Sequence, residues 1–422
     1  MGIVVAMLLA ASSAAGAGAL VDFVARPDAS THWQQRSARE SGGLLEIEAD
    51  LVSQTWRDVA WRHELRVVVP SRRAAGDLAV LVIGGDGVHG AIDERRLAEE
   101  TGAVTAYLRR VPNQPLFGAS EDALIAYSFE QYLRSGDADW PLIFPMTKAA
   151  VKAMDAISAL ASGAGAAEIR RFVVTGASKR GWTSWLAAVA DPRVTAVAPM
   201  VFDNLDFAAQ MKNQQAVWGH YSPMLGDYTE RRLQALIDTE RGRALVSMVD
   251  PFAYRAALER VSKLVVNGSN DPYWEVGAVD FYWSGLGGAK ALLCVPNAGH
   301  DAAADARSAA ALAELVRRTA AGRAMPELSA SSDGVRATIR SDEAPQRVLV
   351  WRTESASRDL RSARWRAAET QREDDRFVAD VAATADGTTA WFAEAEYLSA
   401  GRSFSLSTPV RILPPQSLER SE

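Results

Sequence analysis

The sequence predicts an α/β protein, a mostly parallel β-sheet flanked by helices, with a small C-terminal all-β module. Three observations lead to this prediction. Apolar runs such as residues 77–83 contain almost no polar residue, which is typical of strands buried on both faces. Segments with helical periodicity alternate with these runs. From about residue 325, only short strands remain, separated by Ser, Asp and Gly turns.

Composition narrows the class of protein. The 422 residues are 48% hydrophobic and 23% charged, which allows a large core and two or three domains. The net charge of −6 offers no positive surplus for nucleic acid. The single cysteine, Cys294, excludes an intrachain disulfide and a thiolate zinc site, and the five histidines are too far apart for an HExxH motif. We expect no cofactor and no metal.

The N-terminus is typical of a signal peptide. Residues 3–11 are apolar and a stretch of small residues follows, so residues 1–19 predict a cleaved leader and a secreted or periplasmic protein. The leader lacks the usual Lys or Arg, and the alternative interpretations are a buried strand or a wrongly assigned start of the chain. The run is shorter than the roughly 20 apolar residues that cross a bilayer, and we expect no membrane span elsewhere.

The order of elements predicts the domain boundaries. We expect an α/β domain over residues 20–323 and a β-sandwich-like module over residues 324–422. Residues 205–260 interrupt the alternation with helical patterns and no apolar strand, which predicts a helical lid over the carboxyl edge of the sheet. The predicted strands of the parallel sheet include residues 77–83, 104–108, 172–174, 194–201, 264–266 and 291–295.

A glycine-rich turn predicts a nucleophile. Ser178 follows the apolar strand 172–174 and opens a helix, with Gly176 two residues before it. A serine on such a sharp turn is exposed above the sheet, as in the G-x-S nucleophile elbow. Arg180 stands where a small residue is usual, and Gly181 comes one place later. The alternative is a serine in an ordinary strand–helix turn.

Two residues further along complete a triad. Asp271 follows the strand 264–266, and His300 follows the strand 291–295. A base must take the serine proton and a carboxylate must orient that base, and the order Ser, Asp, His is that of the α/β-hydrolase fold. We therefore expect Ser178, Asp271 and His300 to be catalytic. Asp203, after the strand 194–201, is an alternative acid.

A second glycine-rich turn has two interpretations. The N–H groups of Gly85 and Asp86, together with that of Lys179, are expected to form an oxyanion hole. The same turn holds a GxGxxG pattern ending at Gly90, and Arg109–Arg110 after the next strand suits the extra phosphate of NADP. No acidic residue ends that second strand, and the dinucleotide interpretation leaves the triad residues without a role.

Aromatic residues predict a substrate cleft. Trp218, Tyr221, Tyr273 and Trp274 lie in or near the lid and the acid loop, and we expect them to contact substrate. The alternative is ordinary packing, which is the commoner role of aromatic side chains.

Eight long and unusual strings stand out in the sequence: residues 53–56, 111–116, 121–127, 140–142, 145–149, 153–155, 176–182 and 267–274. They resemble the PhoPQ-activated pathogenicity-related protein family, which includes a secreted autocrine proliferation repressor of slime moulds. The resemblance implies an α/β-hydrolase with a C-terminal β domain, and no particular substrate. The elbow is also similar to that of glucuronoyl esterases, with Lys179 in place of their Arg; a cation there would hold a substrate carboxylate or be solvated.

Together these patterns predict an exported serine hydrolase that cleaves an ester or amide of a small molecule, peptide or carbohydrate. The alternative is a non-enzymatic secreted signalling or interaction protein that keeps the scaffold. An NADP-dependent oxidoreductase is the third hypothesis. The substrate and the oligomeric state are not determined by the sequence.

Overall fold

The computed structural model describes residues 18–87 and 92–413. Most of the predicted signal peptide therefore lies outside the described residues, as does Gly90 of the GxGxxG pattern. Residues 18–25 are helical and bury Leu20, Phe23 and Val24 in the main hydrophobic core. Ala19 packs against the same core, so this short helix is part of the folded domain.

Six parallel strands form the centre of a large sheet, in the order β5-β4-β6-β7-β8-β9. Every residue of β4 and β5 is buried, as expected for strands covered on both faces. The predicted parallel sheet is confirmed. The bounds are β4 (Leu78–Ile83), β5 (Val104–Leu108), β6 (Arg171–Ala177), β7 (Val194–Met200), β8 (Ser262–Gly268) and β9 (Lys290–Val295).

Helices cover both faces of this sheet, and successive side chains of a strand point into two different hydrophobic cores. Leu81 of β4 packs in the same core as α4 and α5, whereas its neighbour Val80 packs in the core that contains side chains of α2 and α9. α3 lies on the side of α4 and α5. The bounds are α2 (Glu94–Thr101), α3 (Glu121–Ser135), α4 (Ile143–Gly163), α5 (Lys179–Ala190) and α9 (Ala306–Ala320).

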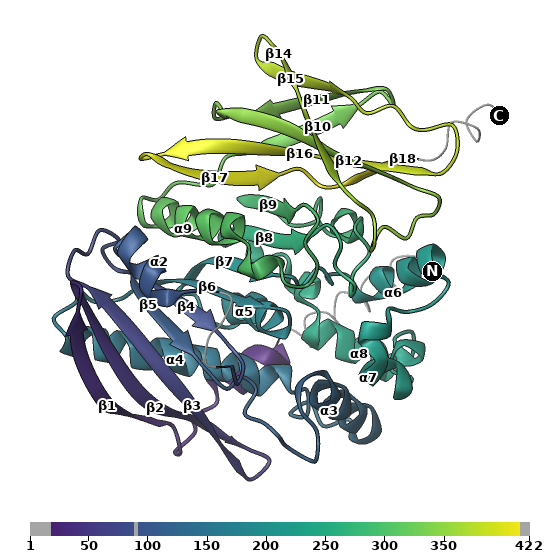
Figure 1. Cartoon of the computed structure of the whole chain (residues 1–422). Helices are drawn as coiled ribbons and strands as arrows, with labels where there is room; N and C mark the ends of the chain where they lie inside the picture. Colours follow the sequence, from purple (N-terminus) through teal and green to yellow (C-terminus); the bar gives the residue numbers. More distant parts are fainter. Residues whose placement is uncertain (1–17, 88–91, 414–422) are drawn as a thin grey trace.

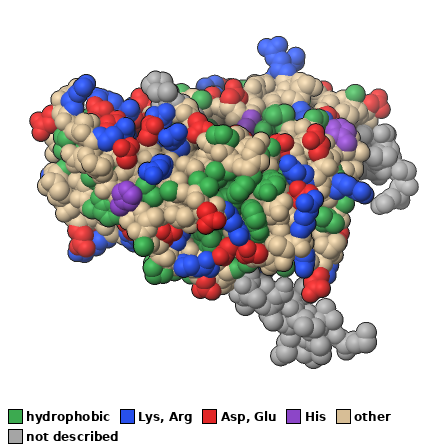
Figure 2. Space-filling model, turned by 90° about the horizontal axis from the view of Figure 1, so that it is seen from below, with side chains coloured by type: hydrophobic (Ala, Val, Ile, Leu, Met, Phe, Trp, Pro, Cys, Tyr) green, Lys and Arg blue, Asp and Glu red, His purple; other side chains and the backbone are tan. Residues whose placement is uncertain are grey.

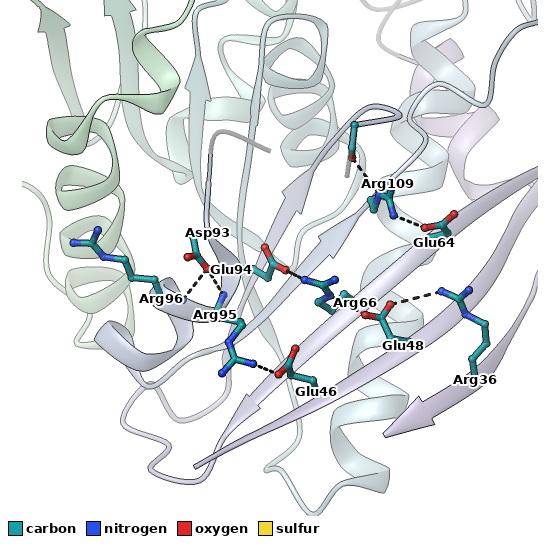
Figure 3. Close-up of polar contacts among 11 residues, drawn as sticks. Arg36, Glu46, Glu48, Glu64, Arg66, Asp93, Glu94, Arg95, Arg96 and Arg109 are labelled. Carbon is teal, nitrogen blue, oxygen red and sulfur yellow. Dashed lines mark hydrogen bonds and ion pairs between the residues drawn. The ribbon is translucent and has the colours of Figure 1, made fainter. Parts of the chain in front are cut away.

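Three long antiparallel strands extend the sheet beyond β5: β1 (His32–Ser41), β2 (Leu44–Trp56) and β3 (Val59–Pro70). Every residue of β1 is exposed, so no apolar alternation could have revealed it. Figure 3 shows ion pairs that tie these strands together and to α2. Glu48 pairs with Arg36 and Arg66, and Arg66 also reaches Glu94 at 2.7 Å.

The segment between β7 and β8 contains helices and no strand, which confirms the helical insertion. All of residues 205–260 are described, and Figure 1 shows these helices beside α3 at one edge of the sheet. The elements are α6 (Phe207–Trp218), η1 (Pro223–Leu225), α7 (Gly226–Glu230), η2 (Gln234–Leu236), α8 (Glu240–Val249), η3 (Pro251–Tyr254) and η4 (Ala257–Arg260). Two more short 3-10 helices follow β8 and β9, namely η5 (Ala278–Phe281) and η6 (Ala302–Ala304).

The C-terminal strands form two antiparallel sheets, which lie on the far side of α9 and β9 from the N-terminal strands (Figure 1). One sheet has the order β10-β11-β15-β14. The other, β17-β16-β12-β13, continues the large sheet because Ser407 of β17 pairs with Leu292 of β9. The bounds are β10 (Leu328–Ser332), β11 (Arg336–Ser341), β12 (Arg347–Ser355), β13 (Arg366–Glu369), β14 (Gln371–Glu373), β15 (Arg376–Asp380), β16 (Thr388–Ser399), β17 (Arg402–Ser407) and β18 (Arg411–Leu413).

The distribution of charged side chains on the surface is consistent with the net charge of −6. On the face seen in Figure 2, acidic and basic side chains are interspersed with small groups of hydrophobic ones. Among the described residues, no helix combines the length and the apolar character that crossing a bilayer requires.

Candidate active site

Ser178 stands on a strained turn between β6 and α5. Its φ of 58° and ψ of −128° are rare for a residue with a side chain. Its N–H donates to Met200 O at 2.8 Å, which fixes the turn to the neighbouring strand β7. The structure thus holds Ser178 in the conformation expected of a nucleophile elbow.

Two glycines allow this turn to close. A Cβ atom on Gly176 would lie 2.8 Å from the backbone and Cβ of Arg180, and one on Gly181 would lie 3.0 Å from two carbonyl oxygens. Arg180 therefore fits at the position where a small residue is usual because Gly176 provides the space. The glycine pattern in the sequence reflects this close crossing of strand and helix.

His300 and Asp271 form a hydrogen-bonded pair. His300 Nδ1 lies 2.8 Å from Asp271 Oδ2, and the Tyr273 N–H donates to Asp271 Oδ1 at 2.8 Å. Asp271 is buried. His300 Nε2 makes no hydrogen bond with any described residue. An imidazole that donates from Nδ1 to a carboxylate has its lone pair on Nε2, where a general base needs it.

Asp203 has a different partner. The Tyr282 hydroxyl donates to Asp203 Oδ1 at 2.5 Å. Burial raises the pKa of Asp203 to about 8, and the charges of Asp271 and Glu275 act in the same direction against the Tyr282 hydrogen bond. The carboxylate that holds His300 in this structure is that of Asp271.

The serine and the His300–Asp271 pair lie at the same edge of the sheet, since β6, β8 and β9 are parallel and all three residues follow their carboxyl ends. Tyr273 connects them. It lines a pocket together with Ser178, and its ring centroid lies 4.2 Å from that of His300. The Ser178 hydroxyl donates to no described residue, which leaves it available to a substrate or to His300.

The predicted oxyanion donors lie on the turn after β4 and at the start of α5. The Lys179 N–H is in the first turn of α5, where no intrahelical acceptor exists. The N–H groups of Gly85 and Asp86 donate to no acceptor among the described residues. The turn is held by its carbonyl and carboxylate oxygens instead: Arg110 N–H donates to Gly85 O at 2.9 Å, and the Gln114 amide donates to Asp86 Oδ2 at 2.8 Å.

Arg109, which the NADP hypothesis assigns to the extra phosphate, already has partners within the protein. Its guanidinium pairs with Glu64 at 2.5 Å (Figure 3). It also donates to the carbonyl oxygens of Asp86 and Gly87. It thus supports the turn after β4, and its positive charge is balanced by Glu64.

A cluster of charges lies next to the nucleophile. Lys179 Nζ contacts Glu121 at 2.9 Å and Asp122 at 3.0 Å, and Arg180 makes two hydrogen bonds of 2.7 Å to Glu121. Burial opposes ionisation of Glu121, but the two cations outweigh it and lower the pKa of Glu121 to about 2. Tyr228 from the lid donates to Asp122 at 3.0 Å. Lys179 is therefore buried and paired, and it is not a solvated side chain.

A pocket with about 880 Å³ of space, its open mouth included, lies beside Ser178. Most of its lining is apolar and comes from α3, α5 and the helices of the lid. Tyr273 and Trp274, predicted to bind substrate, are part of this lining. Trp218 and Tyr221 do not line this pocket. The Arg361 guanidinium lies 4.1 Å from the ring centroid of Trp218, and Tyr221 packs against the main core.

Two asparagines connect the acid and base loops to the C-terminal module. Asn270, next to Asp271, donates to the carbonyl oxygens of Leu360, Arg361 and Ala363, the last at 2.7 Å. Asn297, three residues before His300, exchanges hydrogen bonds of 3.0 and 2.8 Å with the backbone of Trp365. The loops that carry the pair are thus braced from outside the parallel sheet.

Neither the contacts of Glu121 and Asp122 with Lys179 nor the role of the two asparagines follows from the sequence. Glu121 and Asp122 have the pattern of a helix N-terminus, which explains carboxylates without any further partner. Asn270 and Asn297 lie in turns where asparagine is common, and their acceptors are backbone carbonyls, which no side-chain pattern reveals. Only the direct proximity of Asn270 to the predicted acid was a signal.

The described residues contain no group of His, Cys, Asp and Glu side chains arranged to hold a metal ion. Cys294 is buried in β9, and burial raises the pKa of its thiol, so it is a poor nucleophile.

These features define the class: the chain has the α/β-hydrolase fold, with a serine, a histidine and an aspartate at the carboxyl edge of its sheet. The chain belongs to the PhoPQ-activated pathogenicity-related protein family, whose pattern matches residues 20–361.

A curated relative is autocrine proliferation repressor protein A of Dictyostelium discoideum, which is 32% identical over 303 residues. The match covers 67% of this chain and 60% of the length of that relative.

Solved structures of similar fold include acetyl xylan esterase 1 from Thermoanaerobacterium sp. JW/SL YS485, with 14% identity and a TM-score of 0.45 over 68% of this chain and 88% of that one. A glucuronoyl esterase from Solibacter usitatus matches with 12% identity and a TM-score of 0.42 over 71% of this chain and 91% of that one.

Proposed function

We propose that this protein is a serine hydrolase that cleaves an ester or amide bond, with Ser178 as nucleophile, His300 as general base and Asp271 as its orienting carboxylate. One observation carries the proposal. Asp271 holds Nδ1 of His300, and Nε2 makes no hydrogen bond with a described residue, at the same sheet edge as a strained, partly buried serine. This is the combination that acyl transfer through a serine requires.

The reaction proceeds in two halves. The Ser178 hydroxyl oxygen bonds to the substrate carbonyl carbon while its proton passes to His300 Nε2. The bond between that carbon and the leaving group then breaks, and the leaving group takes the proton from His300. In the second half, water attacks the acyl carbon, gives its proton to His300, and the bond to Ser178 breaks as the serine regains that proton.

The negative oxygen of each tetrahedral intermediate is placed near the N–H groups of Lys179, Gly85 and Asp86. Hydrogen bonds aimed at an oxygen only when it carries charge lower the barrier, and removing one such donor costs about 100- to 1,000-fold in kcat. The bonds to the turn after β4 from Gln114 and Arg109 support this role because they use oxygen acceptors and spare the N–H groups.

Labelling with a fluorophosphonate probe tests the proposal. The wild type should be labelled and Ser178→Ala should not, whereas Ser158→Ala, a serine on α4 away from the pocket, should be labelled like the wild type. A folded wild type that is not labelled, or a Ser178→Ala variant that is labelled equally, would disprove the active serine.

The name of the Dictyostelium relative supports a second candidate, a secreted signalling protein that retains the scaffold without catalysis. A correctly folded Ser178→Ala protein that keeps the full biological effect of the wild type would favour this candidate over the hydrolase.

We also propose that the protein is exported to the periplasm or secreted after removal of residues 1–19, and that residues 20–323 and 324–422 form its two domains. The predicted leader ends immediately before Leu20, which is the first buried core residue within the described part of the chain. N-terminal sequencing of the protein from culture medium and periplasm checks the cleavage point; an intact Met1 in the cell pellet would contradict it.

A further inference from the structure

The pocket beside Ser178 is long and runs along α3. Asp122, Phe129 and Leu133 all line it, and their spacings of seven and four residues place them on one face of that helix. At 1.5 Å of rise per residue, Asp122 and Leu133 lie about 16 Å apart along the helix axis. The pocket therefore extends well beyond the space that an acetyl group would fill.

The lid forms the opposite wall with apolar side chains. Leu245, Val246 and Val249 of α8 line the pocket and repeat at helical spacing, and so do Phe207 and Met211 of α6. The lid helix α8 is attached to α5, the helix that follows Ser178, because the Trp182 indole N–H donates to Val249 O at 2.6 Å.

The two ends of the pocket differ in chemistry. Ser178, Lys179 and Asp122 lie at one end, where Lys179 Nζ meets the Asp122 carboxylate. Leu133 marks the other end, where Arg241 of α8 donates to Leu133 O at 2.7 Å and so joins the lid to the end of α3. The scissile bond thus lies at the polar end, and the remainder of the pocket is available to a chain attached to it.

The charges at the polar end are already balanced. Lys179, the cation in the pocket lining, is buried between Glu121 and Asp122. A substrate carboxylate would have to displace one of these acidic groups, which is costly for a buried ion pair. A substrate with an uncharged apolar chain needs no such displacement, and burying that chain is favourable in proportion to its area.

We propose that this pocket binds an apolar chain, aliphatic or aromatic and longer than acetyl, that is attached to the scissile carbonyl group or to its leaving group. The proposal rests on the proposed hydrolase function, and it specifies the substrate class of the same site. It favours hydrophobic esters and amides over acetylated sugars and uronate esters.

Two alkyl fluorophosphonates, one with a methyl and one with an octyl chain, test the proposal through the rate at which each labels Ser178. The phosphorus–oxygen bond to Ser178 forms, fluoride leaves, and His300 takes the serine proton. We expect the octyl probe to label the wild type at least about tenfold faster, since each buried methylene contributes a severalfold gain.

Val246→Trp should remove most of the octyl advantage because the indole fills the middle of the pocket. Ser247→Trp is the matched control: it is the next residue on α8, it is also partly buried, and it does not line the pocket. It should keep the advantage and show that the helix tolerates the larger side chain.

The outcomes separate the two proposals. Absence of labelling by both probes overturns the hydrolase function and this inference with it. Equal labelling rates in the wild type, or an octyl advantage that Val246→Trp retains, overturn the apolar pocket and leave the hydrolase intact. If a Val246→Trp protein does not fold, Leu245→Ala gives the same test, because a wider pocket should change the octyl rate and leave the methyl rate constant.

Discussion

Asp203 and Asp271 follow neighbouring parallel strands, β7 and β8, and are equally buried at 5% exposure. Their partners differ. Asp271 meets the imidazole of His300 and a backbone N–H, whereas Asp203 meets the hydroxyl of Tyr282. Burial without a cation raises the pKa of Asp203 to about 8. Position and burial alone therefore do not make a carboxylate catalytic; the group that it contacts decides.

The supports of the two loops also differ. Asn270 and Asn297 attach the acid and base loops to backbone carbonyls of the C-terminal module. The loop after β7 leads into the lid, and Asp250 of the lid accepts a hydrogen bond of 2.9 Å from the Phe207 N–H. We infer that the C-terminal module orients the proposed catalytic pair, and that the lid shapes the pocket.

Asp271→Asn gives the largest effect that this comparison predicts. The amide can hold the wrong tautomer of His300, and under the proposed mechanism kcat should fall by about 10⁴-fold, as it does in Ser-His-Asp triads. Steady-state hydrolysis of an octanoate ester measures this, with Asp203→Asn as the matched control because it sits at the same depth in the protein.

Asp203→Asn should keep kcat within about threefold of the wild type, since the amide still accepts from Tyr282. A large loss in Asp203→Asn together with a small loss in Asp271→Asn would reverse the assignment of the acid.

Asn297→Ala and Asn270→Ala should have an intermediate effect. Either change removes the hydrogen bonds that hold one loop, so the Asp271–His300 pair can shift relative to Ser178. A misplacement of about 1 Å costs up to about 100-fold in kcat. KM should change little because neither side chain lines the pocket. Ser341→Ala, which removes a hydrogen bond to Tyr397 within the module, is the control.

A rise in KM at constant kcat in the Asn297→Ala variant would show that the module acts on substrate binding, and the proposed positioning role would be wrong.

The smallest effect concerns stability and its dependence on pH. Because the pKa of Asp203 is raised to about 8 in the folded protein, its stabilising contribution is complete below its ordinary pKa and is lost as the pH rises through about 8. Asp203→Asn cannot ionise, so its free energy of unfolding should fall less than that of the wild type between about pH 5 and pH 9.

Urea unfolding at these two pH values measures the difference. Asp250, whose pKa burial raises to about 7, remains in the variant and leaves part of the slope. Parallel pH profiles of wild type and variant would mean that Asp203 is ionised at neutral pH.

Much of the fold follows from local patterns. The strands β4 to β9 are apolar runs, and the glycines around Ser178 mark the turn, so both were predictable from short stretches of sequence. β1 was not, because its exposed, polar residues carry no periodicity. Asp271 was predicted as the partner of His300 from its place on the loop after the strand 264–266, with Asp203 as the alternative, and the structure has Asp271 and His300 in contact.

The sequence by itself determined the parallel sheet, the helical insertion and the placement of the serine, acid and base on loops at one edge. These depend on hydrophobic periodicity and on turns, which act over a few residues. Only the tertiary structure decided that Lys179 is neutralised by Glu121 and Asp122, that α3 and the lid enclose an apolar pocket, and that Asn270 and Asn297 reach the C-terminal module. These contacts join residues more than fifty positions apart, and their energies depend on burial and geometry that exist only after the chain has folded.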